Sequence, residues 1–307
     1  MANIKDSVPS DFTSPTALPT NSEQARQWQR ANLTWWDSHP MRYDWKEAID
    51  AREFTKEFYQ EIDRRFFSRL QEFMPWKRIP FDPLVDFDAL REREVLEIGV
   101  GNGSQAGLFA QYAHSFTGID ITDYAVKSTA KRMSCFGLAA TIARMDAENM
   151  EFAENSFDFI WSWGVIHHSS NPRKILQEIY RVLKPGGEAM IMVYHRGLWN
   201  YYLIGGLIYV LEKGHWLKSK SLHEIVQLKT DGAIARYYSV SEWSTLASEL
   251  FQIEEVKVYG SKAEVILMPG GIVKEKIMTL VPNSLARFWT NRCRMGSFLV
   301  SILKKTG

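Results

Sequence analysis

Residues 95–105 read VLEIGVGNGSQ: a short apolar run, three closely spaced glycines and the start of a predicted helix. A strand that turns through glycines into a helix is typical of α/β proteins that bind nucleotides, because glycine lets the backbone approach the ligand closely. The dinucleotide fingerprint G-x-G-x-x-G needs its third glycine directly after Gly103, where this chain has Ser104. The spacing G-x-G-x-G alone leaves open which nucleotide binds.

Acidic residues stand beside this loop and at the ends of the next two predicted strands. Glu97 precedes Gly99 by two positions, where its carboxylate would repel a pyrophosphate and attract an amino group. This favours S-adenosyl-L-methionine (SAM), which carries an amino group and a sulfonium but no phosphate, over NAD. Asp120 is placed to accept hydrogen bonds from both ribose hydroxyls, and Asp146 to meet the adenine amino group. The alternative for each acid is that it caps the following helix.

The chain around the loop alternates short apolar runs with helical segments, which predicts βαβ units and a parallel sheet. The predicted strands are residues 94–98, 115–120, 141–145, 157–163, 188–194, 253–259 and 296–303. The predicted helices between them are residues 104–113, 123–136, 173–183 and 241–250, and the KPGG run at 184–187 is expected to end the third of these.

Three regions follow from this pattern. Residues 1–20 are polar and rich in Pro, Ser and Thr, and we expect a disordered tail. Residues 21–90 are expected to form a helical cap or lid, with one helix that begins at Asn21 or Ser22 and a longer one over 46–73. Residues 91–307 are expected to form the SAM-binding domain, with insertions at 196–236 and 261–295 that build the substrate side.

Composition excludes several classes of protein. A net charge of +1 gives no basic field for nucleic acid. Cys135 and Cys293 lie far apart and the histidines are scattered, so we expect neither a disulfide framework nor a metal site. The first twenty residues lack the apolar segment of a secretory signal, and the longest uncharged run, 197–211, is short for a membrane span. We therefore expect a cytoplasmic protein.

Five stretches taken together resemble the class I SAM-dependent methyltransferases, of the type 11 or UbiE-like small-molecule group. They are VLEIGVGNG, GIDIT, MDAENMEF, SFDFIWSWGVIHHSSNP and RVLKPGGEAMIMVYHR, within residues 91–196. The resemblance implies a Rossmann-like α/β sheet of seven strands in the order 3-2-1-4-5-7-6, with the seventh antiparallel. It implies that the cofactor contacts Glu97, Gly99, Gly101, Gly103, Asp120, Ile121, Asp146 and Ala147. Glu151 departs from the family, which usually has proline there, and this affects only a loop turn.

Methyl transfer from a sulfonium is an in-line displacement that depends chiefly on how the acceptor is held. We expect Trp163 and Gly164 to lie beside the methionine part of SAM. His167 and His168 are candidate general bases, or they orient the loop through backbone hydrogen bonds. Further candidates to line the acceptor site are Tyr43, Trp45, His195 and Tyr238.

The acceptor is not identified by the sequence. Residues 197–221 are apolar on nearly all sides, as expected of a core helix, or of one that faces a lipid-like acceptor, a membrane surface or a dimer partner. Residues 271–307 carry seven Lys or Arg and one Glu, typical of a solvated face or of a surface for an acidic substrate or anionic bilayer. The main hypothesis is O- or C-methylation of a small or amphiphilic molecule, with S-adenosyl-L-homocysteine as product. The alternatives are a SAM-binding protein without catalysis and an NAD-dependent oxidoreductase.

Overall fold

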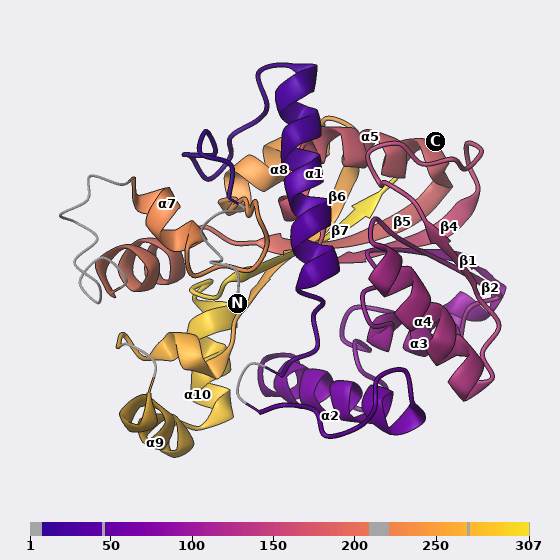
Figure 1. Ribbon diagram of the computed structural model, residues 1–307. Helices are drawn as coiled ribbons and strands as arrows, with labels where there is room; N and C mark the ends of the chain where they lie inside the picture. Colours follow the sequence, from indigo (N-terminus) through magenta and orange to yellow (C-terminus); the bar gives the residue numbers. More distant parts are fainter. Residues whose placement is uncertain (1–7, 45–46, 209–220, 269–270, 307) are drawn as a thin grey trace.

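The computed structural model describes residues 8–44, 47–208, 221–268 and 271–306, and its centre is a sheet of seven strands (Figure 1). The strands are β1 (Glu94–Ile98), β2 (Ser115–Asp120), β3 (Thr141–Arg144), β4 (Phe157–Trp163), β5 (Leu183–Tyr194), β6 (Gln252–Tyr259) and β7 (Phe298–Lys304). Their order is β3-β2-β1-β4-β5-β7-β6, and β7 runs antiparallel to both β5 and β6. The predicted fold class and strand order are confirmed.

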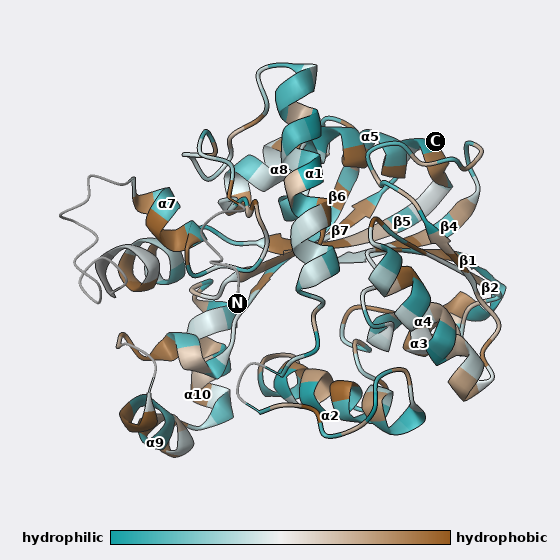
Figure 2. Cartoon of the chain, viewed as in Figure 1, coloured by the Kyte–Doolittle hydropathy of each residue, from teal (hydrophilic) through white to brown (hydrophobic). Residues whose placement is uncertain are grey.

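Helices cover both faces of the sheet, as the buried, apolar strands require. Successive residues of β5 alternate between the two faces: Ala189 and Ile191 pack with α5 (Pro172–Val182) and α8 (Val240–Ser248), whereas Met190 and Met192 pack toward α2 (Lys56–Phe73). The other helices on the described chain are α1 (Ser22–Ser38), α3 (Ser104–Phe109), α4 (Asp123–Phe136), α7 (Leu222–Gln227), α9 (Ile272–Leu280) and α10 (Asn283–Arg287). Short 3-10 helices lie at η2 (Ala89–Glu92), η3 (Ile166–His168) and η6 (Lys262–Val265). π-Helical segments lie at η4 (Leu198–Ile208) and η7 (Phe288–Arg292). Figure 2 shows the strands as largely hydrophobic and α1 as largely hydrophilic.

The N-terminal segment is more ordered than its composition predicts. The Asn21 side chain caps α1 by accepting a hydrogen bond from the Gln24 N–H at 2.9 Å, as expected. Residues 8–20 differ from the predicted disordered tail, because Phe12 is buried edge-to-face against Trp28 with ring centroids 5.3 Å apart. The Tyr237 N–H also donates to the Pro15 carbonyl at 2.9 Å. Burial of Phe12 and hydrogen bonds to the backbone therefore hold this polar segment on the domain.

The second cap helix and the KPGG run differ from the prediction in their boundaries. α2 begins about ten residues later than expected, after Thr55, whose hydroxyl accepts from the Phe58 N–H at 3.3 Å. Phe54 lies before it at φ +64°, outside the helix. α5 does end at Val182, but KPGG continues as part of β5. Gly187 is required there because a Cβ would lie 3.0 Å from the Asp158 carbonyl oxygen.

The two insertions both leave the sheet at the end of a strand. The first carries η4 and α7 between β5 and α8, and the second carries η6, α9, α10 and η7 between β6 and β7. They meet where the Trp199 indole N–H donates to the Glu264 carbonyl at 2.6 Å. Residues 209–220, part of the apolar run expected within 197–221, lie outside the described residues. In the described chain no helix combines the length and apolar character that crossing a membrane requires.

Glu264, in the second insertion, is expected to make the stability of the fold depend on pH. Its Oε1 accepts from the Ser261 N–H at 2.7 Å and the Ser297 hydroxyl at 2.9 Å, while its buried Oε2 has no partner. Burial raises the pKa of the Glu264 carboxyl to about 7. The folded pKa exceeds the unfolded one, so the stabilisation from the bound proton is complete below about pH 4.5 and is lost as pH rises through 7.

We therefore expect the free energy of unfolding to fall by up to about 3 kcal/mol across this interval. Glu264→Gln should remove that component of the pH dependence, and the exposed Glu275→Gln should not. Urea denaturation of the three proteins between pH 5 and pH 8 measures it. Parallel pH profiles for wild type and Glu264→Gln would contradict the assignment.

Candidate functional site

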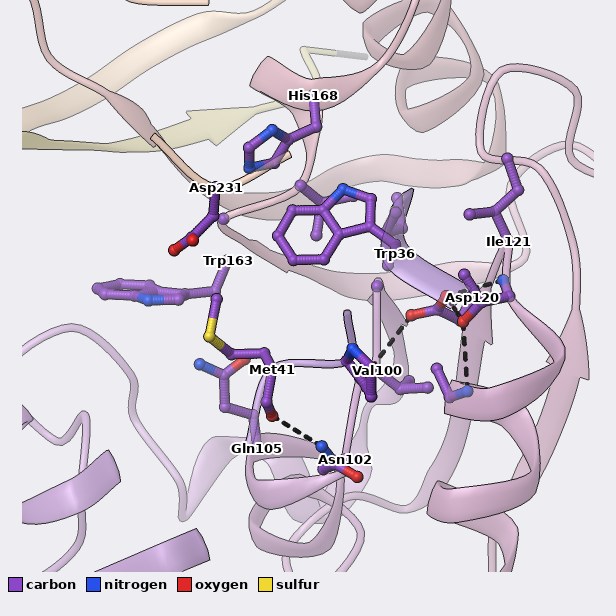
Figure 3. A pocket seen from close by; sticks show the side chains of 18 of the residues that line it. Trp36, Met41, Val100, Asn102, Gln105, Asp120, Ile121, Trp163, His168 and Asp231 are labelled. Carbon is purple, nitrogen blue, oxygen red and sulfur yellow. Dashed lines mark hydrogen bonds between the residues drawn. The ribbon is translucent and has the colours of Figure 1, made fainter. Parts of the chain in front are cut away.

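A single continuous pocket of about 390 Å³ lies at the carboxyl ends of β1, β2 and β4, within the size range of small-molecule sites. In open α/β sheets this edge is where ligands bind. Its floor is the glycine loop after β1, and its cover is formed by α1 and the segment that follows α1 (Figure 3). Nine of the ten residues predicted to contact the cofactor line it: Gly99, Gly101, Gly103, Asp120, Ile121, Asp146, Ala147, Trp163 and Gly164.

The glycine loop adopts a conformation that side chains would prevent. Gly99, Gly101 and Gly103 all have positive φ, at +83°, +54° and +77°. A Cβ on Gly99 would lie 2.2 Å from the Val165 side chain, and one on Gly103 would lie 2.9 Å from Arg132. A Cβ on Gly101 would meet no protein atom within 4 Å, because it would project into the pocket itself. The first and third glycines therefore serve packing, and the second keeps space for a ligand.

Asp120 joins the end of β2 to this loop. Its carboxylate accepts hydrogen bonds from the Gly101 N–H at 3.1 Å, the Thr122 N–H at 3.0 Å and the Thr122 hydroxyl at 2.9 Å (Figure 3). Burial raises the pKa of Asp120 despite these bonds. These bonds use three of the carboxylate's roughly four lone-pair positions, so one ribose hydroxyl would find a free position on Oδ2 and a second would replace the Thr122 hydroxyl on Oδ1.

Glu97 lies behind the loop and does not line the pocket, although it was predicted to contact the cofactor. It is 1% exposed, and its Oε2 has no hydrogen-bond partner in the described chain. Burial, and then the nearby Asp120 charge, raise the pKa of Glu97 well above its usual value. A cation close to the loop would favour the ionised form of this carboxyl and give Oε2 a partner, whereas an anion would do neither. Glu97 thus fits the amino group of SAM better than a pyrophosphate.

Asp146 is already engaged by the cap. The Gln29 side-chain amide, on α1, donates to its two carboxylate oxygens at 2.9 and 3.0 Å, and the Gln29 oxygen accepts from the Ser170 N–H at 3.1 Å. Gln29 therefore contacts the carboxylate that we expected to meet the adenine amino group. Asn32, one turn further along α1, donates to the His168 carbonyl. Both amides tie α1 across the pocket.

The segment after α1 closes the opposite side. The Asn102 amide, in the glycine loop, donates to the Met41 carbonyl at 2.7 Å (Figure 3). The buried Arg132 supports the loop from beneath by donating to the Asn102 carbonyl at 3.4 Å and pairing with Asp63 of α2. Trp36 and Met41 consequently lie over the pocket.

The two candidate bases differ in where they lie. His168 lines the pocket, and its Nδ1 is 2.6 Å from the Ile234 carbonyl, so Nδ1 carries the proton and Nε2 has the lone pair. Burial lowers the pKa of His168 to about 4, so the ring is neutral at pH 7. His167 does not line the pocket: it is fully buried with its ring 3.9 Å from that of Tyr194, and burial lowers its pKa well below the usual value. Its position is that of a packing residue.

Of the residues predicted to line the acceptor site, some line the pocket and others do not. Tyr43 lines the pocket, whereas His195 and Tyr238 do not. His195 is buried at the end of β5 with its Nδ1 2.7 Å from the Gly296 carbonyl, and Tyr238 packs on Trp243 at 5.3 Å. Both belong to the junction of the first insertion with the sheet, where His195 and Tyr238 form an isolated β-bridge with each other. Trp45 lies outside the described residues.

The far end of the pocket is a mostly apolar chamber that the sequence did not reveal. Besides Tyr43 and Trp163, its lining includes Phe66, Arg69 and Phe73 from α2, together with Met192, Tyr194 and Phe298 from the sheet. Asp231, from the loop after α7, also lines it and points toward the space between His168 and Trp163 (Figure 3). Of this chamber the sequence indicated Tyr43 and a helical cap or lid over residues 21–90. No sequence motif marked Asp231 as a pocket residue.

In the described part of the chain, no group of three or more His, Cys, Asp or Glu side chains is arranged to hold a metal ion.

Comparison with known proteins finds relatives of the segment that carries the glycine loop, Asp120 and Asp146. Residues 96–191 match the family Methyltransf_11, described as a methyltransferase domain. A phthiotriol/phenolphthiotriol dimycocerosates methyltransferase of Mycobacterium tuberculosis is 36% identical over 97 residues, which are 31% of this chain and 35% of that protein. The match thus spans about a third of that relative's length. A ubiquinone biosynthesis O-methyltransferase of Pseudomonas aeruginosa is 28% identical over 171 residues, 53% of this chain and 72% of that protein.

The fold is shared with solved structures of low sequence identity. A chain from a Haloferax volcanii complex that contains the Trm112 methyltransferase activator covers 84% of this chain and aligns over its own full length, with a TM-score of 0.51 and 15% identity. This likeness concerns the architecture alone.

Proposed function

We propose that this chain, which carries a SAM-dependent methyltransferase domain in residues 96–191, transfers the methyl group of SAM to a hydroxyl oxygen of a small, largely apolar acceptor. The observation that carries the proposal is the continuity of the pocket. Its lining includes Asp120 on the cofactor side, Gly164 after β4, and Asp231 in the aromatic chamber. On this proposal the cofactor and the acceptor occupy one continuous pocket.

Bound SAM supplies an electrophilic methyl group, and this chain's residues would hold it in place. Asp120 would bind the ribose hydroxyls, and Glu97 would face the amino group from beneath the glycine loop. Ile121 and Ala147, which line the pocket on either side of Asp146, would contact the adenine. Gly164, at φ +79°, has no Cβ to narrow the passage toward the chamber. The protein's contribution to rate is then to hold the acceptor in line and to exclude water.

The chamber favours an acceptor with an aromatic or aliphatic body. Phe66, Phe73 and Phe298 line it with apolar rings, and the ring centroids of Phe73 and Phe298 lie 5.4 Å apart in a tilted arrangement. The ubiquinone biosynthesis relative is by its name an O-methyltransferase, which supports oxygen as the methylated atom.

Asp231 is our candidate for the proton acceptor. Burial raises the pKa of Asp231, and Tyr43 and Tyr194, whose pKa values are raised first by burial and also by the Asp231 charge, line the same pocket. An ionised carboxylate in such surroundings is a stronger base than one in water. His168 Nε2 is the second candidate, and its bond to the Ile234 carbonyl fixes the ring so that Nε2 is the nitrogen able to accept.

The proposal is tested with trideuteromethyl SAM and a series of alkylphenols and alkylcatechols of graded chain length. We expect a deuterated methyl ether, identified by mass spectrometry, with kcat/KM that rises with chain length. If SAM binds but no member of the series, nor a matched series of amines and thiols, is methylated, the SAM-binding protein without catalysis is the better description.

Asp231→Asn should then lower kcat by about a hundredfold, the lower end of what a general base contributes, with SAM affinity unchanged. Asn has the same shape but cannot take the proton. His168→Ala serves as the comparison, and the exposed Asp50→Asn as the control. Full activity in Asp231→Asn together with loss in His168→Ala would transfer the role of base to the imidazole.

A further inference from the structure

The largest group of exposed apolar side chains on the described chain belongs to the second insertion. α9 has no buried residue at all, and its Ile272, Val273 and Leu280 are 73%, 64% and 81% exposed. Exposed apolar side chains continue into α10 and η7. We call the set the α9–α10 face, and its members are Ile272, Val273, Ile277, Leu280, Leu285 and Phe288. Figure 2 shows hydrophobic residues interspersed with hydrophilic ones on α9, which Figure 1 places away from the sheet.

Exposing these apolar side chains of α9 to water contributes no stabilisation from apolar burial. Helices in soluble proteins bury an apolar stripe, and contiguous apolar patches of this kind mark surfaces that bind another molecule. The face is therefore a binding surface, and its charges indicate what it binds.

Basic residues accompany the face. Residues 271–296 contain five Lys or Arg and one Glu. Lys274 and Arg287 are held by carbonyls, at 3.0 Å to Met268 and 3.1 Å to Glu72. Lys276, Arg292 and Arg294 are exposed. Apolar side chains flanked by cations match an anionic lipid surface, to which each nearby cation adds attraction.

A second copy of this chain fits the face less well. A twofold interface would bring the same basic surface against itself and set like charges in contact. A bilayer with acidic headgroups supplies both the apolar phase and the opposite charge.

The face is also joined to the acceptor chamber. The Asn291 amide, in η7, donates to the Phe73 carbonyl at 2.8 Å, and Arg287 donates to Glu72 beside it. Phe73 and its neighbour Phe298 line the pocket. A molecule held at this surface would thus lie near the end of the pocket where the acceptor is expected.

We propose that the α9–α10 face docks this protein on an anionic membrane surface, from which an amphiphilic acceptor reaches the chamber. Docking follows from the face itself, and only the acceptor clause rests on the proposed function.

Vesicle sedimentation of the full chain, without SAM or acceptor, tests docking separately from catalysis. The probes are vesicles of phosphatidylcholine alone and of phosphatidylcholine with about a third phosphatidylglycerol. We expect at least tenfold stronger binding to the anionic vesicles, weakened by salt. Ile272→Ser/Leu280→Ser should lose at least tenfold in that binding, and Lys276→Glu/Arg292→Glu should lose the preference for anionic vesicles. Leu18→Ser, at an exposed leucine elsewhere, is the control.

Circular dichroism checks that each variant is folded, and because α9 buries no side chain we expect the serine variant to keep wild-type stability. Absence of vesicle binding by folded wild type would overturn the proposal. So would a concentration-dependent dimer, seen by analytical ultracentrifugation, that Ile272→Ser/Leu280→Ser abolishes without affecting vesicle binding. That second result would assign the face to another copy of the chain.

Discussion

Gly101→Ala is expected to abolish SAM binding while the protein remains folded. Gly101 has φ +54°, so alanine there costs about 1 kcal/mol of backbone strain. The added Cβ meets no protein atom within 4 Å, and the fold can accept it. The space that it enters is the floor of the pocket, against which we expect the methionine part of SAM to lie. A methyl group placed there removes the close approach that the glycine provides.

Gly137→Ala is the matched control for this experiment. Gly137 caps α4 at φ +65°, and a Cβ there also meets nothing within 4 Å, but the residue does not line the pocket. The two variants should therefore lose similar thermal stability, and only Gly101→Ala should lose SAM affinity in isothermal titration calorimetry. Equal SAM affinity in both would mean that the ligand does not lie against this loop.

Asp120→Ala is expected to weaken SAM binding by about a thousandfold. We expect its carboxylate to accept hydrogen bonds from two ribose hydroxyls, and bonds to a charged group contribute about 1.5–3 kcal/mol each. The variant also loses the bond from the Gly101 N–H, so the loop is held less firmly. Asp120→Asn should fall between alanine and wild type, because the amide keeps one acceptor oxygen.

The nearby Asp123→Ala is the control for charge. Asp123 is at the start of α4, three quarters exposed, and pairs with Arg144 at 3.1 Å away from the pocket. We expect its SAM affinity to match that of wild type. An unchanged dissociation constant in Asp120→Ala, measured by calorimetry on protein with a wild-type circular dichroism spectrum, would remove Asp120 from the ribose site.

Most of the fold, and the cofactor side of the pocket, could be predicted from local sequence patterns. The strands at 94–98, 115–120 and 157–163 were predicted with their observed bounds, because buried parallel strands are short apolar runs between turn and helix signals. The positions of the glycine loop and Asp120 could be predicted because each lies at the carboxyl end of a strand that the local sequence identifies. In such a sheet, adjacent strand ends meet at one edge whatever the rest of the chain does.

The cap and the acceptor side depend on contacts between distant segments. Gln29 reaches Asp146 across 117 positions of sequence, and no local pattern distinguishes it from other exposed glutamines of a helix. Asp231 reaches the chamber only because the first insertion folds back over the sheet. For the same reason the paired histidines could not be separated: one residue of difference along η3 puts His168 in the pocket and His167 in the core.

The central claim is that the pocket binds SAM and not a dinucleotide. It is tested most directly by titrating the wild-type protein with SAM, S-adenosyl-L-homocysteine and NAD in one calorimetric series. We predict that the first two bind one per chain and that NAD gives no binding heat, because its pyrophosphate, unlike the amino group of SAM, offers the buried Glu97 carboxyl no positive charge. Binding of NAD, or the absence of binding by both SAM and S-adenosyl-L-homocysteine, would contradict this account.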